Sequence, residues 1–224
     1  EMGLHGFAQK MPMAVTEKSE QAVTFSLQAN EETKKMYPFD FTFRVSYALQ
    51  GNRIAVTFDV TNNGSGDMPY SVGGHPGFRV PLGDAGRFED CYLDFGEKCA
   101  PEMFLLSPTC FLSGETAPFK LRCGKRLDLR HDLFDNDAIF LKDAAKSVSI
   151  KSRACKKSVT VEYPSMDYVG FWHADHTDAP FVCIEPWNGL PGTDGHVDDF
   201  SDKRAMRHLA GGQSETSGFS ILIQ

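Results

Sequence analysis

The sequence Phe39-Asp-Phe-Thr-Phe-Arg-Val-Ser-Tyr-Ala-Leu49 alternates large apolar residues with small or polar ones along its whole length. Successive side chains of a β-strand point to opposite faces, so the large apolar residues of this stretch would share one face. After the turn sequence Gln50-Gly51-Asn52, the alternation resumes at Ile54 and continues to Val60. Two alternating segments around a short glycine-containing turn predict an antiparallel hairpin with one buried face.

Short segments rich in β-branched and aromatic residues recur along the rest of the chain. They predict strands at 23–28, 87–95, 138–141, 148–150, 159–163, 168–172, 181–185 and 218–223. We expect a helical turn at 31–36, a tight turn at 113–115 and one or two helical turns at 203–209. No internal repeat or linker separates these segments. Residues 1–224 are therefore expected to form a single all-β domain, a sandwich or a larger assembly of antiparallel sheets.

Composition excludes several classes of protein. The chain has 224 residues and a formal net charge of −7, which argues against binding to nucleic acid. Its residues are 41% hydrophobic, but no apolar run is long enough to span a bilayer. The six cysteines form no CxxC pair, and no signal peptide is visible. These features predict reduced thiols in a cytoplasmic protein, whose oligomeric state the sequence does not reveal.

The stretch Phe181-Val-Cys-Ile-Glu185-Pro-Trp187-Asn-Gly189 contains the first candidate for chemistry. If residues 181–185 form a strand, Glu185 stands at its end among apolar neighbours, where Pro186 stops regular pairing. Such surroundings disfavour the charged carboxylate and raise its pKa toward the range of a general base. Trp187 offers a flat apolar surface suited to a sugar ring. The alternative is an ordinary surface glutamate at a strand-to-loop turn.

A second candidate lies in Gly73-Gly-His75-Pro-Gly-Phe78, within a segment whose glycines and prolines exclude a long helix. Pro76 favours an extended conformation for His75, which holds the imidazole on a stiff support. The alternative is a structural turn in which this histidine bonds a neighbouring carbonyl group.

Two further clusters resemble metal sites only weakly. Asp135 and Asp137 could ligate calcium, but the glycine and the closing glutamate of an EF-hand loop are absent, so a simple turn before strand 138–141 is the alternative. The sequence His173-Ala-Asp-His176 places three possible zinc ligands in four residues. Because no second ligand cluster accompanies them, we expect a solvated loop there and no metal.

Taken together, these motifs resemble the aldose 1-epimerase branch of the galactose mutarotase-like superfamily, the branch that includes the LacX-type proteins. The matching segments stand in family order along the whole chain. They are HGFA at 5–8, YPFDF at 37–41, GGHPGFRVPL at 73–82, LFDNDAIF at 133–140 and APFVCIEPWNG at 179–189.

The resemblance implies a β-supersandwich of layered antiparallel sheets with a concave face that binds sugar. Two departures from the family pattern stand near the start of the chain. Gln9 follows HGFA where arginine is common, which removes one expected anion or hydroxyl contact. Family members also carry several strands before HGFA, so we expect the sheet to lack its N-terminal strands and to expose an unpaired edge.

The resemblance also implies interconversion of the α and β anomers of an aldose without cofactor or metal. In that reaction the anomeric hydroxyl loses a proton while the ring oxygen gains one, and we expect a base and an acid on opposite sides of the sugar. By resemblance, Glu185 is the base and His75 the acid, while His5 and Asp135 bond other hydroxyls. Trp187 and Phe78 are expected, from residue type, to pack on the sugar.

Two other functions remain open at this point. A non-catalytic carbohydrate-binding protein would keep the same fold. A glycoside hydrolase would need two carboxylates flanking the scissile bond, for which Asp135 and Glu185 are the obvious pair. The resemblance implies a monosaccharide partner, either a hexose or a hexose phosphate. Arg79 and Arg44 are the basic residues available for a phosphate group.

Overall fold

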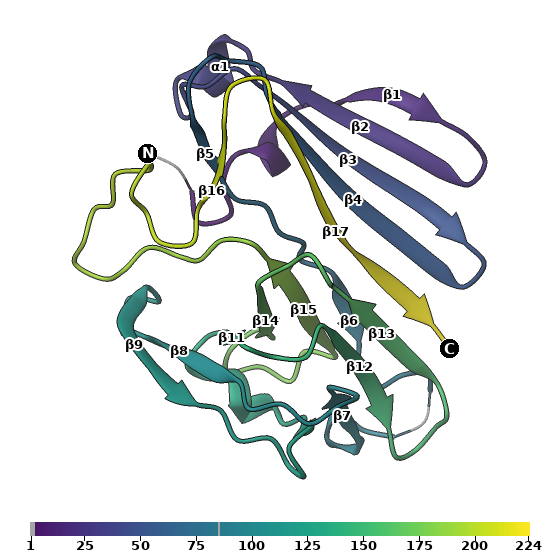
Figure 1. Cartoon of the computed structure of the whole chain (residues 1–224). Coiled ribbons are helices and arrows are strands. Elements are labelled where there is room, and N and C mark those ends of the chain that lie inside the picture. The colour runs from purple at the N-terminus through teal and green to yellow at the C-terminus, as the bar shows by residue number, and fades with distance from the viewer. Residues whose placement is uncertain (1–2, 85) are drawn as a thin grey trace.

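The computed structural model describes residues 3–84 and 86–224. Its largest element is an antiparallel sheet that extends across the molecule and twists strongly (Figure 1). In spatial order, the nine strands of this sheet are β1 (Ala14–Lys18), β2 (Ala22–Gln28), β3 (Phe41–Gln50), β4 (Arg53–Asn62), β17 (Ser214–Ile223), β13 (Ser158–Glu162), β12 (Ser147–Ser152), β7 (Cys91–Asp94) and β10 (Arg126–Asp128).

Two smaller antiparallel sheets complete the fold. The six-stranded sheet contains, in spatial order, β6 (Gly77–Arg79), β15 (Phe181–Trp187), β14 (Tyr168–Trp172), β11 (Ile139–Lys142), β8 (Glu102–Leu106) and β9 (Leu112–Pro118). The third sheet pairs β5 (Met68–Tyr70) with β16 (Arg207–Leu209). The helical elements are α1 (Glu31–Lys34) and the 3-10 turns η1 (Ala8–Lys10), η2 (Phe88–Asp90) and η3 (His131–Phe134). The expected class of layered antiparallel sheets with very little helix is confirmed.

The predicted hairpin is the pair β3–β4, joined through Gly51 at a positive φ of 62°. Its apolar residues do face inward near the middle of the molecule, where Val56 and Phe58 are buried. Toward the hairpin tip the same stripe leaves the core, and Tyr47 and Leu49 are 43% and 51% exposed. The alternation in the sequence therefore predicts the strands correctly but overestimates how far the apolar face is covered.

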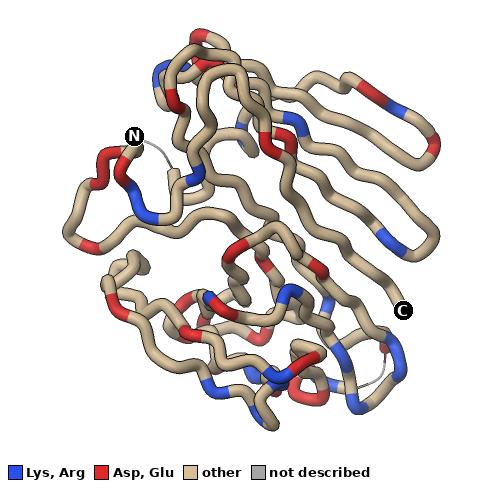
Figure 2. Tube along the Cα trace, viewed as in Figure 1, with Lys and Arg blue, Asp and Glu red and all other residues tan. Residues whose placement is uncertain are grey.

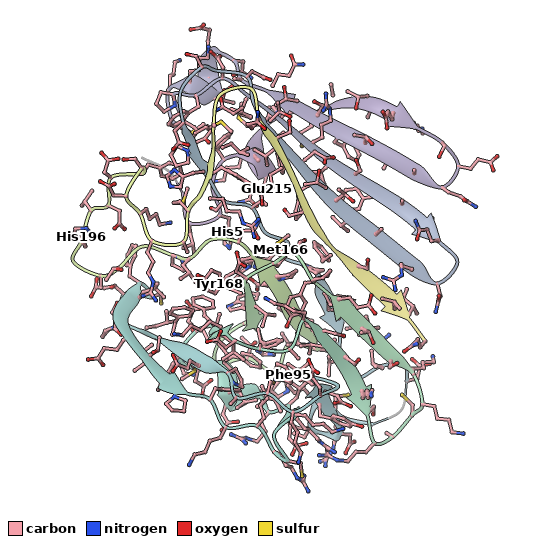
Figure 3. All side chains as sticks on the ribbon, viewed as in Figure 1. His5, Phe95, Met166, Tyr168, His196 and Glu215 are labelled. Carbon is pink, nitrogen blue, oxygen red and sulfur yellow. The ribbon has the colours of Figure 1, made fainter. Side chains whose placement is uncertain are left out.

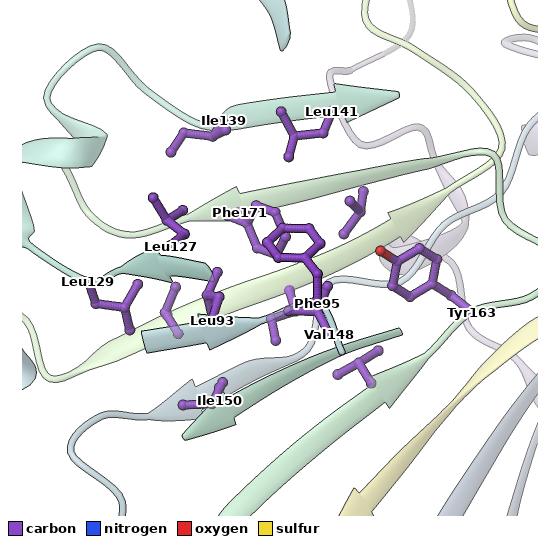
Figure 4. Packing of buried hydrophobic residues seen from close by; sticks show 14 of the residues in the cluster. Leu93, Phe95, Leu127, Leu129, Ile139, Leu141, Val148, Ile150, Tyr163 and Phe171 are labelled. Carbon is purple, nitrogen blue, oxygen red and sulfur yellow. The ribbon is translucent and has the colours of Figure 1, made fainter. Parts of the chain in front are cut away.

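The main core lies between the nine-stranded and six-stranded sheets. Leu93, Val148 and Ile150 approach it from the large sheet, and Phe171 and Leu141 from the smaller one (Figure 4). Leu93, Val148, Ile150 and Phe171 are fully buried, so this interface excludes water and makes one rigid unit of the two sheets.

Smaller clusters lie on either side of this core. One covers the end of the large sheet beneath α1 and includes Tyr37, Phe41 and Met68. The other lies on the opposite face of the six-stranded sheet and is built around Phe104 and Phe140. That opposite face also carries the candidate functional side chains described below.

Two local expectations are wrong. Residues 113–115 do not form a separate turn but lie inside β9, at the irregularity in its pairing with β8 between Phe104 and Leu106, where Gly114 has a φ of 90°. Residues 203–209 contain no helix. Their last three residues form β16, which pairs with β5, and this pairing buries Leu209 in the cluster beneath α1.

Strand β1 was not expected, because all five of its residues are exposed and its sequence carries no apolar alternation. It pairs with β2 and forms one edge of the nine-stranded sheet, with an irregularity in register between Val15 and Glu17. Such irregular edges discourage pairing with other chains.

Several global features agree with the composition. The six cysteines are free thiols. Within residues 3–84 and 86–224, no helix is long and apolar enough to cross a membrane. Acidic and basic residues are interspersed along the trace (Figure 2).

Gly74 is a point of close approach between the two large sheets. Phe219 of β17 packs against this residue, and a Cβ atom at position 74 would lie 2.7 Å from Cζ of the Phe219 ring and nearer still to Cε1. The absence of a side chain therefore lets the segment that carries His75 pack directly on the core.

We predict that Gly74→Ala lowers the free energy of unfolding by about 1–3 kcal/mol, because the added methyl group overpacks the interface with Phe219. Urea denaturation measures this change. Gly66→Ala is the matched control, because a Cβ there meets nothing within 4 Å; its effect should stay within about 0.5 kcal/mol. Equal effects of the two substitutions would show that the contact between Gly74 and Phe219 is not tight.

Candidate active site

His75 and Glu185 face each other across an antiparallel ladder. Strand β6 pairs with β15, with Gly77 opposite Cys183. The pairing continues beyond β6, because the Gly74 amide donates to the Pro186 carbonyl at 3.0 Å and Gly73 bridges to Trp187. This register places His75 opposite Glu185, and opposite residues of such a ladder share one face of the sheet.

The two side chains meet at their polar ends. His75 Nε2 lies 3.3 Å from Glu185 Oε1. The Glu185 side chain is 5% exposed, whereas that of His75 is 41% exposed, so the imidazole lies between the carboxyl group and solvent. Oε1 is buried and has no hydrogen-bond partner among the residues that the structure describes, so the contact with the imidazole is close but not aligned as a hydrogen bond. An orphaned carboxylate oxygen of this kind is available to a ligand.

Burial shifts the pKa values of both groups in opposite directions. Desolvation, with a smaller contribution from the charge of Asp137, raises the pKa of Glu185 to about 8. Desolvation also lowers the pKa of His75; the nearby His5 adds to this lowering, and a backbone hydrogen bond opposes it. A carboxyl group that holds its proton near neutral pH, beside an imidazole that releases its own, forms an acid–base pair.

Trp187, which was singled out from the sequence, lies beside the pair formed by His75 and Glu185. Trp187 is two residues beyond Glu185 on the same face of β15, and its ring covers Gly170 of the neighbouring strand. Its ring centroid lies 4.8 Å from that of Phe140. The indole is therefore a half-buried wall of the site, held in place by packing.

His5 reaches the same region from the start of the described chain. Its ring centroid lies 5.4 Å from that of His75, and the side chain is exposed. Figure 3 shows His5 near the centre of the view, between the nine-stranded sheet above and the six-stranded sheet below. The structure thus brings together His5, His75, Glu185 and Trp187, four of the six residues singled out from the sequence.

Asp135 does not join this group. Its carboxylate lies 3.3 Å from Nδ1 of His176, and both residues line a separate surface pocket with Asp178. Asp137, two residues further on, has a positive φ of 72° and lies close enough to raise the pKa of Glu185. Of the two aspartates, the charge of Asp137 therefore acts on Glu185, a distinction that the sequence motif alone did not make.

Phe78 lies on the wrong face to contact a ligand at this site. It stands opposite Val182 in the β6–β15 pairing and packs against the main core. Because side chains alternate along a strand, Phe78 must point away from the face that carries His75. This placement does not support the expectation that Phe78 packs on a sugar.

The expectation of a solvated loop at 173–176 fails for His173. This residue is fully buried, stacked between Phe134 and Phe181, and its Nε2 lies 2.7 Å from the Ala179 carbonyl oxygen. His173 lies just beyond the end of β14, and its side chain keeps the alternation of that strand and points inward. His176 is exposed, as predicted.

Two residues beside the pair were not singled out from the sequence. Trp172 stands opposite Cys183 in the β14–β15 pairing, and its ring centroid lies 5.9 Å from that of His75. Cys183 itself occupies the position between Phe181 and Glu185 on the same face. Once the pairing of β14 with β15 is known, the alternation of each strand identifies both residues.

Comparisons with known proteins identify relatives that match most of the chain. Residues 1–198 match the profile of the family described as Aldose 1-epimerase. The chromosomal protein LacX of Lactococcus lactis subsp. lactis is 37% identical over 191 residues, which cover 83% of this chain and 63% of LacX. The chain thus spans less than two thirds of that relative.

Solved structures agree with this match. A galactose mutarotase related enzyme from Lactobacillus acidophilus superposes with a TM-score of 0.92 at 32% identity, over 100% of this chain and 74% of the other. A galactose mutarotase-like protein from Lactobacillus casei gives 0.90 at 30% identity, over 100% of this chain and 76% of the other.

We predict that Glu185→Gln gains stability relative to the unmodified protein as the pH rises. The folded pKa of Glu185 is raised, so the stability that it contributes is complete below its unfolded value and is lost as the pH rises through about 8. Glutamine does not ionise, so the variant does not lose this stability. Between pH 6 and pH 8, the unfolding free energy of Glu185→Gln should therefore rise by about 2 kcal/mol relative to that of the unmodified protein.

Urea denaturation at several pH values measures this difference. Glu89→Gln serves as the control, because the Glu89 side chain is exposed. If the Glu185→Gln variant and the unmodified protein show parallel pH dependence, Glu185 does not hold its proton in the folded state.

Proposed function

Because the chain belongs to the aldose 1-epimerase family, we propose that it interconverts the α and β anomers of an aldose at the pair formed by His75 and Glu185. The observation that supports this proposal most strongly is the 3.3 Å approach of His75 Nε2 to the buried Oε1 of Glu185. Family membership supplies the class of chemistry, and this pair supplies groups able to perform it.

The spacing of the pair matches the reacting atoms of a cyclic sugar. Ring opening requires proton removal from the hydroxyl at the anomeric carbon and proton delivery to the ring oxygen, and both oxygens are bonded to that one carbon. A base and an acid that lie side by side can therefore reach both. No sugar ring fits between groups 3.3 Å apart, so the two groups would meet the anomeric centre from one side, not from opposite sides as expected from the sequence.

The proton count of the pair is also consistent with the reaction. To open the ring, the pair must carry one proton in total, and that proton must be on His75, the acid, while Glu185, the base, is ionised. Burial places that proton on Glu185 in the free protein, since it raises the pKa of the carboxyl group and lowers that of the imidazole. This is the protonation state expected after ring opening, when Glu185 has taken the anomeric proton and His75 has given one up. Closure of the ring from the other face reverses both transfers and gives the second anomer.

Neighbouring side chains are suited to holding the sugar. His5 is exposed beside His75, and the charge of Asp137 contributes to the raised pKa of Glu185, so we assign these two to hydroxyl groups of the sugar. Trp187 lies beside Glu185 on the same face of β15, where its ring covers Gly170. Fixing the ring in this way places the anomeric carbon against the reacting pair.

Polarimetry distinguishes this function from the alternatives. Freshly dissolved α-glucose or α-galactose should lose optical rotation faster in the presence of the protein. Saturable sugar binding without acceleration would indicate a carbohydrate-binding protein. Release of sugar from a glycoside would indicate a hydrolase, although Asp135 lies with His176 in a separate pocket and is poorly placed to act with Glu185. A parallel assay with a hexose 6-phosphate tests whether the substrate is phosphorylated.

We predict that Glu185→Gln and His75→Gln each lower the rate of mutarotation by about 10²–10⁴-fold, the usual contribution of a general acid or base. Initial rates measured by polarimetry give these ratios. Glu89→Gln and His196→Gln are the matched controls, because both residues are exposed and neither lies among the groups of the site described above. An unchanged rate in Glu185→Gln would remove this residue from the mechanism.

We predict that Asp137→Asn raises KM by about 10-fold or more, because a hydrogen bond to a charged group contributes about 1.5–3 kcal/mol. Asp135→Asn should leave KM within twofold, since this carboxylate lies against His176. Comparison of the two variants by polarimetry at several sugar concentrations tests the assignment; a larger effect of Asp135→Asn would reverse it.

A further inference from the structure

Three different metal-ligating side chains converge within the candidate site. The Nε2 or Nδ1 atom of His75, Sγ of Cys183 and a carboxylate oxygen of Glu185 all lie within 4.8 Å of one another. Cys183 and Glu185 are buried, and His75 separates them from solvent.

The same ladder that pairs the two proposed catalytic groups brings in the thiol. Cys183 precedes Glu185 by two residues, so both side chains leave the same face of β15. Gly77 stands opposite Cys183, and even a Cβ atom at Gly77 would lie 3.5 Å from Sγ. Because Gly77 has no side chain, no Cβ atom covers Sγ from that position of the partner strand.

The separations suit a four-coordinate ion. Zinc bonds of ~2.0–2.3 Å in a tetrahedral arrangement hold neighbouring ligand atoms ~3.3–3.8 Å apart. The distance from His75 Nε2 to Glu185 Oε1 is 3.3 Å, already at the lower end of that range. The remaining separations are at most 4.8 Å, so side-chain rotations that bring these atoms closer by up to about 1 Å would complete the arrangement, with the fourth position left for water.

A buried and unsatisfied oxygen independently indicates a missing partner. Glu185 is 4% exposed, and its Oε1 has no hydrogen-bond partner in the described part of the chain. A buried carboxylate of this kind gains most from a directly bound cation. We propose that His75, Cys183 and Glu185 form a binding site for a zinc-like divalent cation.

The ligand set determines which ions are suitable. One nitrogen, one sulfur and one oxygen donor suit Zn²⁺, Co²⁺ and Cd²⁺, whereas Mg²⁺ and Ca²⁺ prefer oxygen donors throughout. Binding replaces the thiol proton of Cys183, since thiolate is the form that ligates metal.

Occupation of this site would block the proposed reaction. The ion would bond Nε2 of His75 and Oε1 of Glu185, which are the two atoms assigned to proton transfer. Metal binding and turnover therefore exclude each other, and the ion acts as an inhibitor. This consequence rests on the proposed function, whereas the binding site itself does not.

Cobalt titration of the chelator-treated protein tests the site directly. We expect one equivalent of Co²⁺ to produce the ultraviolet thiolate-to-cobalt charge-transfer band and the visible absorption of a tetrahedral ion. Cys183→Ser should abolish the charge-transfer band and weaken binding by at least about 10-fold, the minimum cost of losing a contact that supports a metal. Cys123→Ser is the matched control, because Cys123 is an exposed thiol outside the cluster and should change neither signal.

His75→Gln provides a second variant that retains the thiol. It should also weaken cobalt binding by at least about 10-fold, because it removes the nitrogen donor. Absence of the charge-transfer band in the unmodified protein would overturn the proposal, as would equal behaviour of Cys183→Ser and Cys123→Ser with circular dichroism showing both to be folded.

Polarimetry then separates the site from the function. Zn²⁺ should slow mutarotation by the unmodified protein, and a chelator should restore it. Measured against its own metal-free rate, Cys183→Ser should be at least about 10-fold less sensitive to Zn²⁺ than the unmodified protein, because it lacks the thiolate ligand. If the metal-free protein does not accelerate mutarotation at all, the proposed function fails while the cobalt titration still decides the metal site.

Discussion

The structure depends on the antiparallel ladder between β15 and the segment that contains Gly73 and His75. This ladder joins two pieces of chain that are more than one hundred residues apart in the sequence and aligns them so that His75 stands opposite Glu185. Backbone hydrogen bonds on both sides of the pair, from Gly74 to Pro186 and from Ile184 to Pro76, hold this alignment. A slip of one residue would move the imidazole to the opposite face.

The two faces of the ladder serve different purposes. On the core face, Gly74 contacts Phe219, and Phe78 packs into the apolar layer between the large sheets. On the other face, polar and reactive groups gather around Glu185 among aromatic walls. The rigidity of the core face is what allows the other face to hold a carboxyl group away from water, since a loosely packed strand would let solvent reach it.

Burial of Glu185 lowers stability and at the same time makes the residue useful. Water would stabilise its ionised form, and desolvation raises its pKa to about 8 instead. The protein tolerates this cost at a position where the carboxyl group, the imidazole and a thiol lie together. The same desolvation makes the group a suitable acid–base partner for a sugar and a strong ligand for a cation, so one local property underlies both proposals.

The sequence by itself determined the strand-rich class, the β3–β4 hairpin, and His75 and Glu185 as the residues of interest. The strands depend on local alternation, which is visible in a linear chain. The choice of His75 and Glu185 also needed the resemblance to the aldose 1-epimerase family, because their residue types alone left structural alternatives open. Whether Asp135 or Asp137 approaches the site, which way Phe78 points, and whether His173 is buried were decided only by the tertiary structure. Each depends on a turn with positive φ or on the register of a partner strand distant in sequence, because register determines which face of a sheet every side chain occupies.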